Sequence, residues 1–107
     1  MANYLHYTYR TTWLDADQQF VGLCAEFPSL SWIEGTPTKA HAGIIKLVED
    51  VVADMEEMGE IIPEPLSHKH FSGKFQVRIP PESHRNLAID AAEKGISMNR
   101  LVSLKLA

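Results

Sequence analysis

The chain has few of the residues that mark secreted, membrane-bound or disulfide-linked proteins. Cys24 is its single cysteine among 107 residues, so no disulfide can form within the chain, and a reducing compartment is expected. No apolar run approaches the roughly 18 residues of a membrane span. The first residues also lack the basic stretch and apolar core of a signal peptide. These absences predict a cytoplasmic protein that does not enter a membrane.

Motifs for catalysis and metal binding are scarce as well. The sequence contains no glycine-rich phosphate loop and no serine-nucleophile motif. His68 and His70 could bind a metal, but two ligands with no cysteine beside them are a weak signal, and we interpret them as solvated linker histidines. Cys24 has no basic neighbour in the sequence, and we interpret it as a small core residue. We therefore expect no cofactor and no metal site.

What the chain does have is enough apolar residues for a folded core and a strongly uneven charge. Hydrophobic residues make up 45% of the sequence, and its length fits one domain or two very small ones. Residues 72–107 hold six Lys or Arg against three Asp or Glu, a net charge of +3, whereas residues 1–71 hold four against eleven, a net charge of −7. A basic module joined to an acidic body predicts a C-terminal end that binds nucleic acid and a front region with a different partner.

Polar and apolar residues alternate strictly from Lys74 to Ile79, which is typical of a strand with one face in solvent. One face would carry Lys74, Gln76 and Arg78, and the other Phe75, Val77 and Ile79. Pro80 and Pro81 end the strand, and a proline fits the first turn of a helix.

Two helices are predicted after this strand. The first runs from about Pro81 to Lys94 and is stopped by Gly95. Ser97 then caps a second helix that runs to the end of the chain. A unit of 36 residues is too small to fold alone, and its single strand has no neighbour. Both needs are met if two copies pair their strands antiparallel, with an expected dimer core of Phe75, Val77, Ile79, Leu87 and Leu101.

The front region is predicted to hold a small antiparallel sheet and one helix. The strands are expected at residues 4–14, 20–27 and 30–33, and the helix at residues 36–58. Ile61 and Ile62 could add a short final strand. We therefore divide the chain into a front domain at residues 1–62, a proline-containing linker at residues 63–71 and a C-terminal domain at residues 72–107. The predicted fold class is α+β.

Both regions resemble a known family. Residues 72–88 read Ser-Gly-Lys-Phe-Gln-Val-Arg-Ile-Pro-Pro-Glu-Ser-His-Arg-Asn-Leu-Ala, and residues 91–102 read Ala-Ala-Glu-Lys-Gly-Ile-Ser-Met-Asn-Arg-Leu-Val. This wording resembles the C-terminal ribbon-helix-helix domain of HicB-type antitoxins. Residues 20–30, Phe-Val-Gly-Leu-Cys-Ala-Glu-Phe-Pro-Ser-Leu, are similar to the HicB N-terminal domain, a sheet-and-helix unit likened to a partial RNase H fold. Ser-Trp-Ile at residues 31–33 stands where that family often has Pro-Gly-Cys.

The resemblance implies two partners. One is a HicA-type toxin, a small RNA-binding protein that cleaves messenger RNA, and the other is operator DNA with an inverted repeat. In the implied ribbon, Lys74, Gln76 and Arg78 contact bases, while Ser97, Met98 and Asn99 hold a phosphate at a helix N-terminus. The acidic residues of the front helix would suit a basic toxin. The expected assembly is a homodimer, and the sequence leaves open whether dimers pair into tetramers.

The resulting hypothesis is a bacterial, cytoplasmic, non-enzymatic antitoxin that represses its own operon and is nucleoid-associated when it binds the operator. One alternative is a ligand-sensing or structural module that the ribbon dimerises without reading DNA. Another is a vestigial nuclease. A working RNase H-like site needs several converging carboxylates, and the predicted strands offer only Glu26 and Glu34, with Asp15 and Asp17 in a turn. The operator sequence and the toxin-contact residues cannot be read from the sequence.

Overall fold

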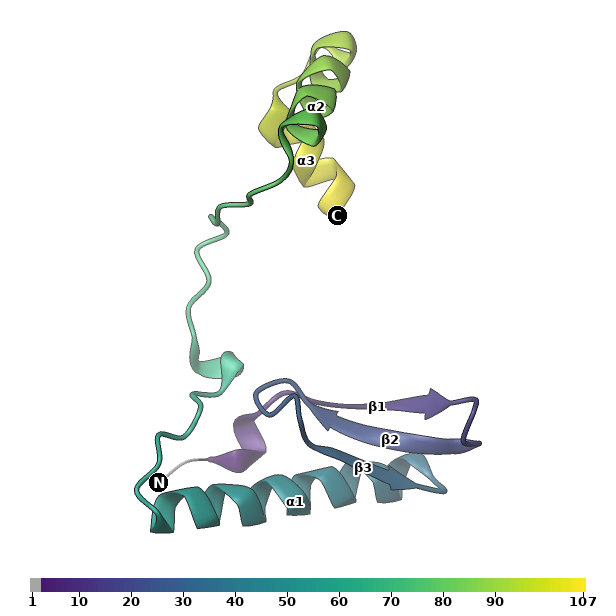
Figure 1. The fold of residues 1–107 in the computed structure, drawn as a ribbon, viewed down its shortest axis with the longest axis vertical. Helices are drawn as coiled ribbons and strands as arrows, with labels where there is room; N and C mark the ends of the chain where they lie inside the picture. Colours follow the sequence, from purple (N-terminus) through teal and green to yellow (C-terminus); the bar gives the residue numbers. More distant parts are fainter. Residues whose placement is uncertain (1–2) are drawn as a thin grey trace. The chain divides into compact units, whose positions relative to one another are not determined.

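The computed structural model describes residues 3–107. The chain divides into two compact units between Phe71 and Ser72. We call residues 1–71 the front unit and residues 72–107 the ribbon unit, and each is described by itself (Figure 1). The front unit contains the sheet and the long helix, and the ribbon unit contains two short helices.

The front unit is built on a three-stranded antiparallel sheet in the order β1-β2-β3. Strand β1 spans Tyr9–Leu14, β2 spans Gln19–Cys24 and β3 spans Ser31–Glu34. Thr11 lies opposite Gly22, and Gly22 lies opposite Trp32. The predicted hairpin and third strand are therefore confirmed, with bounds that are shorter or shifted by a few residues.

The predicted strand at residues 4–14 is wrong in its first half. Tyr4–His6 forms a short 3-10 helix, η1, and the strand begins only at Tyr9. Asn3 starts this turn because its side-chain oxygen accepts a hydrogen bond from the N–H of Leu5 (3.2 Å), a local bond that competes with strand formation. The added strand suggested for Ile61 and Ile62 is also wrong, since these residues are not part of the sheet.

Helix α1, Pro37–Glu57, covers one face of this sheet (Figure 1). Thr36 caps it by accepting a hydrogen bond from the N–H of Lys39 (3.2 Å), and Pro37 occupies the first turn as predicted. The helix buries one stripe of side chains at a spacing of four residues: Ala40, Ile44, Val48 and Val52. With Tyr7, Cys24 and Phe27, most of this stripe makes the main core of the front unit.

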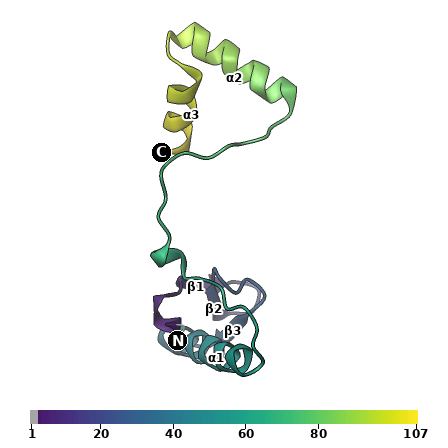
Figure 2. The ribbon, with the colours of Figure 1, turned by 90° about the vertical axis from the view of Figure 1, so that its left-hand side faces the viewer.

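Both predicted C-terminal helices are present in the ribbon unit (Figure 2), which confirms them. Helix α2 spans Pro81–Lys94 and ends at Gly95, whose φ of 67° lies in the left-handed region that favours glycine. The N–H of Ile96 then bonds to the carbonyl oxygen of Ala91 (3.1 Å). Helix α3 spans Met98–Leu106. Only Ala91 and Leu101 are buried in this unit, which is a very small core.

No helix within residues 3–107 combines the length and the apolar character needed to cross a membrane.

Candidate nucleic-acid interface

The segment from Ser72 to Pro80 is extended but is not hydrogen-bonded into a sheet within the single chain. A strand needs a neighbour, and the sequence assigns that neighbour to a second copy. The predicted ribbon therefore stays a prediction. The segment begins with a local turn in which the hydroxyl oxygen of Ser72 accepts a hydrogen bond from the N–H of Lys74 (3.1 Å). Gly73 takes a φ of 85° there.

The three predicted base-contacting residues, Lys74, Gln76 and Arg78, are all exposed. The apolar residues between them are exposed as well: Phe75 has a relative exposure of 74%, Val77 of 64% and Ile79 of 37%. Three apolar side chains in solvent, at alternate positions of one short segment, form an unusual surface for a small folded unit.

A hollow of about 420 Å³ lies beside this segment within the ribbon unit. It is lined by residues of the extended segment, α2 and α3: Ile79, Ser83, Asn86, Leu87, Asp90 and Lys105. Leu87 is half-buried, and Leu101 is 3% exposed. Of the five predicted dimer-core residues, the single chain therefore buries Leu101 and part of Leu87, and it leaves the strand residues uncovered.

The N-terminus of α3 is arranged as its sequence predicts. The hydroxyl oxygen of Ser97 accepts a hydrogen bond from the N–H of Arg100 (3.0 Å), which satisfies one of the N–H groups that a helix leaves without a partner in its first turn. The N–H groups of Met98 and Asn99 lie in the same turn, where a helix offers them no carbonyl acceptor. These amides and the helix dipole make a site that can bind an anion, while the Ser97 side chain is already used for capping.

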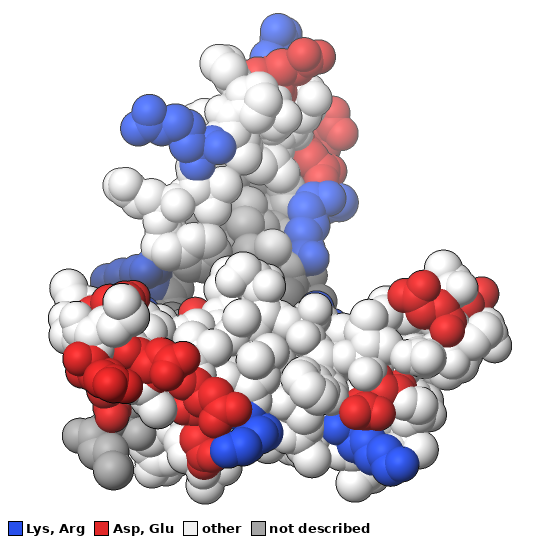
Figure 3. Space-filling view, turned by 60° about the horizontal axis from the view of Figure 1, so that its bottom comes forward, with Lys and Arg blue, Asp and Glu red and all other residues white. Residues whose placement is uncertain are grey.

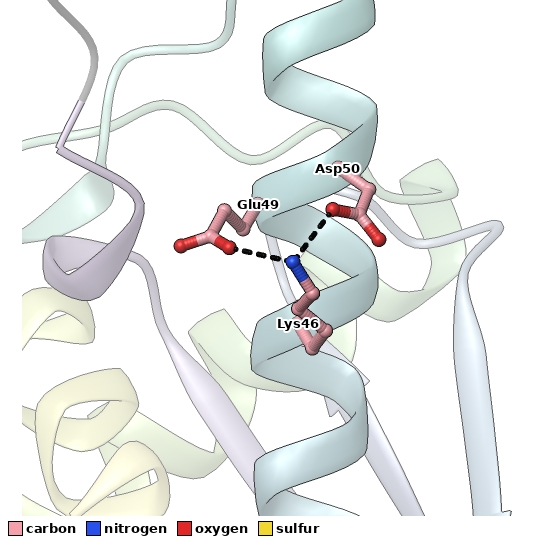
Figure 4. Close-up of polar contacts among 3 residues, drawn as sticks. All are labelled: Lys46, Glu49 and Asp50. Carbon is pink, nitrogen blue, oxygen red and sulfur yellow. Dashed lines mark hydrogen bonds and ion pairs between the residues drawn. The ribbon is translucent and has the colours of Figure 1, made fainter.

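Five of the eleven acidic residues of the front unit lie on α1. Figure 3 shows Asp and Glu side chains gathered on the face that this helix presents. Lys46 pairs there with Glu49 (3.0 Å) and Asp50 (3.1 Å), as Figure 4 shows. A hydrogen bond with Tyr4 and the pairing with Lys46 lower the pKa of the Glu49 carboxyl. One lysine therefore offsets part of a surface that remains negative overall.

The comparisons with known proteins bear on the ribbon unit and the segment before it. The family model described as the HicB family matches residues 58–106. This match supports membership of the HicB family. It covers slightly less than half of the chain and includes the extended segment, α2 and α3. No curated protein and no solved structure matches the chain significantly.

The similarity of residues 58–106 to the HicB family favours an antitoxin-type role in a toxin–antitoxin system, with a HicA-type toxin as the general class of partner. The family match lies outside the sheet of the front unit. The surface through which the front unit acts must therefore be argued from its own residues.

Three of the four carboxylates considered for a nuclease accept hydrogen bonds from neighbouring residues. Glu34 accepts a hydrogen bond from the indole of Trp32 (3.1 Å), and Asp15 accepts one from Trp13 (3.2 Å). Glu26 accepts hydrogen bonds from the N–H groups of Thr8 and Leu66, both 2.9 Å. Among the residues that the structure describes, no three His, Cys, Asp or Glu side chains are grouped so that they could hold a metal ion.

Two further sequence interpretations can be compared with the structure. Cys24 is 1% exposed, and burial raises the pKa of its thiol, so its interpretation as a core residue is confirmed. His68 is exposed as expected, but its partner is not His70. A ring nitrogen of His68 lies 2.6 Å from a ring nitrogen of His6, 62 positions earlier in the chain. Sequence analysis missed this pair because nothing local connects the two residues.

Proposed function

We propose that the chain is a non-enzymatic antitoxin that neutralises a HicA-type toxin and represses its own operon by binding operator DNA. In this role the ribbon unit dimerises and reads DNA, and the front unit masks the toxin. The observation that carries the DNA-binding part is the exposed alternation at residues 74–79, which leaves apolar and hydrogen-bonding side chains uncovered in the same short segment.

The apolar members of the alternation support dimerisation. Phe75 and Val77 are more than half exposed, and leaving such side chains in water is unfavourable by about 1.5–3 kcal/mol each relative to full burial. A second copy of the ribbon unit supplies both a strand neighbour and an apolar surface to cover them. The hollow beside Ile79 and Leu87 gives that copy a place to pack.

The polar members support base reading. A two-stranded ribbon fits the major groove of DNA, where Gln bonds adenine in two places and Arg bonds guanine in two places. Gln76 and Arg78 are exposed and follow each other on the same face of the expected strand. Because the dimer presents two copies, the operator should contain an inverted repeat. The amides of Met98 and Asn99 would hold a phosphate and fix the position of the ribbon without specifying sequence.

The acidic face of α1 supports the toxin-binding part. A protein that binds RNA carries positive charge, and complementary charge speeds and orients association. The exposed acids of the helix and its C-terminal end include Asp50, Asp54, Glu57 and Glu60. This surface belongs to the front unit and the basic segment belongs to the ribbon unit, so the toxin and the DNA would bind different surfaces. The proposed localisation is the bacterial cytoplasm, where both partners act.

The decisive experiment is an operator titration at fixed salt with the double variant Gln76→Ala/Arg78→Ala. Each lost contact should cost about 1–3 kcal/mol and relax sequence preference at defined positions. Arg85→Ala, which removes an exposed cation of α2, is the matched control for net charge. Substitutions at Asn99 should weaken binding on all sequences alike. If the double variant binds the promoter of its own operon as tightly as the parent, the ribbon does not read DNA, and the dimerisation-only alternative replaces this proposal.

Toxin neutralisation is tested separately by co-purification with the product of the adjacent gene. Reversal of charge at Asp50 and Asp54 should weaken that complex, and reversal at Asp17, in the hairpin turn, is the matched control. RNA cleavage by the pure chain that depends on a divalent metal would instead favour the nuclease alternative.

A further inference from the structure

The segment that follows α1 does not leave the front unit at once. Residues 61–68, which we call the clasp, return to the beginning of the chain and bond to it. The hydroxyl of Tyr7 donates a hydrogen bond to the carbonyl oxygen of Pro63 (2.7 Å). The hydroxyl of Ser67 donates one to the carbonyl oxygen of His6 (2.7 Å). Pro65 is buried.

Glu26 is the centre of the clasp. Its carboxylate accepts hydrogen bonds from the N–H and the hydroxyl of Thr8 (2.9 Å and 3.1 Å) and from the N–H of Leu66 (2.9 Å). Proline has no N–H, so after Pro65 the amide of Leu66 is the first donor the backbone can offer. A single half-buried carboxylate therefore joins the start of β1, the end of β2 and the clasp.

The contact between His6 and His68 lies at the end of the clasp. The atoms around His6 indicate which of its ring nitrogens carries the proton. The side-chain oxygen of Asn3 accepts from the N–H of Leu5, so its amide nitrogen is the atom that faces His6 Nε2 (3.0 Å). That nitrogen of His6 must then accept, and the proton lies on Nδ1, which donates to His68 Nε2 (2.6 Å). The pair is then a directed hydrogen bond from the ring of His6 to the ring of His68.

The clasp buries little apolar surface for its length. Ile61 is 94% exposed, Ser67 and His68 are exposed, and Ile62 is only partly buried against the core. The segment is therefore held mainly by the hydrogen bonds above. Segments held by few apolar contacts open at a lower free energy than the core and can do so while the rest of the unit stays folded.

We propose that the clasp is a releasable device that sets the length of the tether between the two units. When it is closed, the free tether between the clasp and the expected strand at residues 74–79 is residues 69–73, which can span at most about 18 Å. When it is open, the tether begins at Gly59 after the end of α1, and residues 59–73 can span about 54 Å. The effective concentration of one unit near the other, and so the gain from binding two partners together, depends steeply on this length.

The first test is hydrogen exchange of the Leu66 amide, measured by NMR on the full chain. Glu26→Gln keeps the size of the side chain but removes the charge that accepts three bonds, and the Leu66 amide should exchange about 10- to 100-fold faster. The matched control is Glu64→Gln, the same change at an exposed position inside the clasp. Exchange of the Val48 amide in α1 should stay unchanged, which separates opening of the clasp from unfolding of the unit.

The second test is small-angle scattering of the same proteins, because the inference concerns reach. The maximum dimension of Glu26→Gln should exceed that of the parent by up to about 35 Å per chain, and Glu64→Gln should match the parent. Tyr7→Phe removes only the hydroxyl that donates to the carbonyl oxygen of Pro63. This variant tests release of the clasp if Glu26→Gln does not fold. Faster exchange without a change in dimension, or parent-like exchange in both variants, overturns the inference. Neither readout uses toxin or DNA, so the result is independent of the proposed function.

Discussion

The indole ring of Trp32 on β3 packs directly against the Cα atom of Gly43 on α1, in the space that the Cβ of any other residue would fill. The third strand and the helix therefore contact each other through the Trp32 ring, at a helix position that has no side chain. This contact helps to hold α1 flat against the sheet. It also explains why a residue unfavourable in helices stands in the middle of one.

Replacement of Gly43 by alanine should destabilise the front unit. Alanine favours a helix over glycine by up to about 1 kcal/mol, but the added Cβ must displace Trp32, and overpacking of this kind costs about 1–3 kcal/mol. The net loss should be about 1–2 kcal/mol in a denaturant melt. Gly35→Ala is the control, because a Cβ there meets no atom within 4 Å. Equal stability of the two variants would show that displacing the ring costs no more than alanine gains in helix propensity.

Replacement of Phe75 by alanine should weaken the dimer. The side chain is 74% exposed in the single chain, so the change removes little from the folded unit and acts mainly on the interface. If the ribbon forms, the loss should approach the 3–5 kcal/mol that deletion of a buried aromatic costs in a core. Phe71→Ala is matched in chemistry and exposure, 71%, but lies before the expected strand. Sedimentation at micromolar concentration measures the dimerisation of both variants. A parent chain that is a folded monomer under these conditions would contradict the dimer itself.

The helices and the three strands, apart from the start of β1, could be predicted from the sequence because their signals are local. Thr36 and Pro37 mark the start of α1, Gly95 marks the end of α2, and Ser97 marks the start of α3. Each of these residues acts on its own few neighbours through capping or a special φ. The aromatic and β-branched composition of residues 4–14 misled the analysis at its beginning, where one side-chain bond from Asn3 favoured a turn.

The clasp could not be predicted because its hydrogen bonds join residues that lie far apart in the sequence. Tyr7 and Pro63, and Glu26 and Leu66, are 56 and 40 positions apart, and neither pair leaves a periodic trace in the sequence. Proline-rich composition is typical of an extended linker, and it says nothing about the surface on which that linker lies. The ribbon is a third case, because its strand pattern is clear but the neighbour expected for that strand is a second copy of the chain.

Truncation offers a test of where the front unit ends. A chain that stops at residue 71 should keep the stability of the front unit, because Pro65 and the bonds of the clasp remain. A chain that stops at residue 60 loses the acceptor of the Tyr7 hydroxyl and uncovers part of the core, and it should be less stable by about 2–4 kcal/mol. Thermal melts compare the two. Toxin binding should persist in the longer piece, although more weakly if two copies normally act together.

A final prediction concerns the pH dependence that Glu26 gives to the front unit. Partial burial by itself raises the pKa of this carboxyl, but the hydrogen bonds from Leu66 and Thr8 outweigh burial and lower the pKa below its ordinary value. The unfolded chain therefore takes up a proton at higher pH than the folded chain. The stabilisation is fully present above the ordinary glutamate pKa and is lost as the pH falls through the lowered pKa of the folded state.

The parent should accordingly exceed Glu26→Gln in unfolding free energy by about 1–2 kcal/mol at pH 7, and the difference should shrink as the pH falls below the ordinary range of glutamate. Urea melts of both proteins between pH 7 and pH 3 measure it. Glu64→Gln, the same change at an exposed side chain, is the control. A difference between parent and Glu26→Gln that stays constant down to pH 3 would mean that the charge of Glu26 does not hold the clasp, and that the variant acts through packing alone.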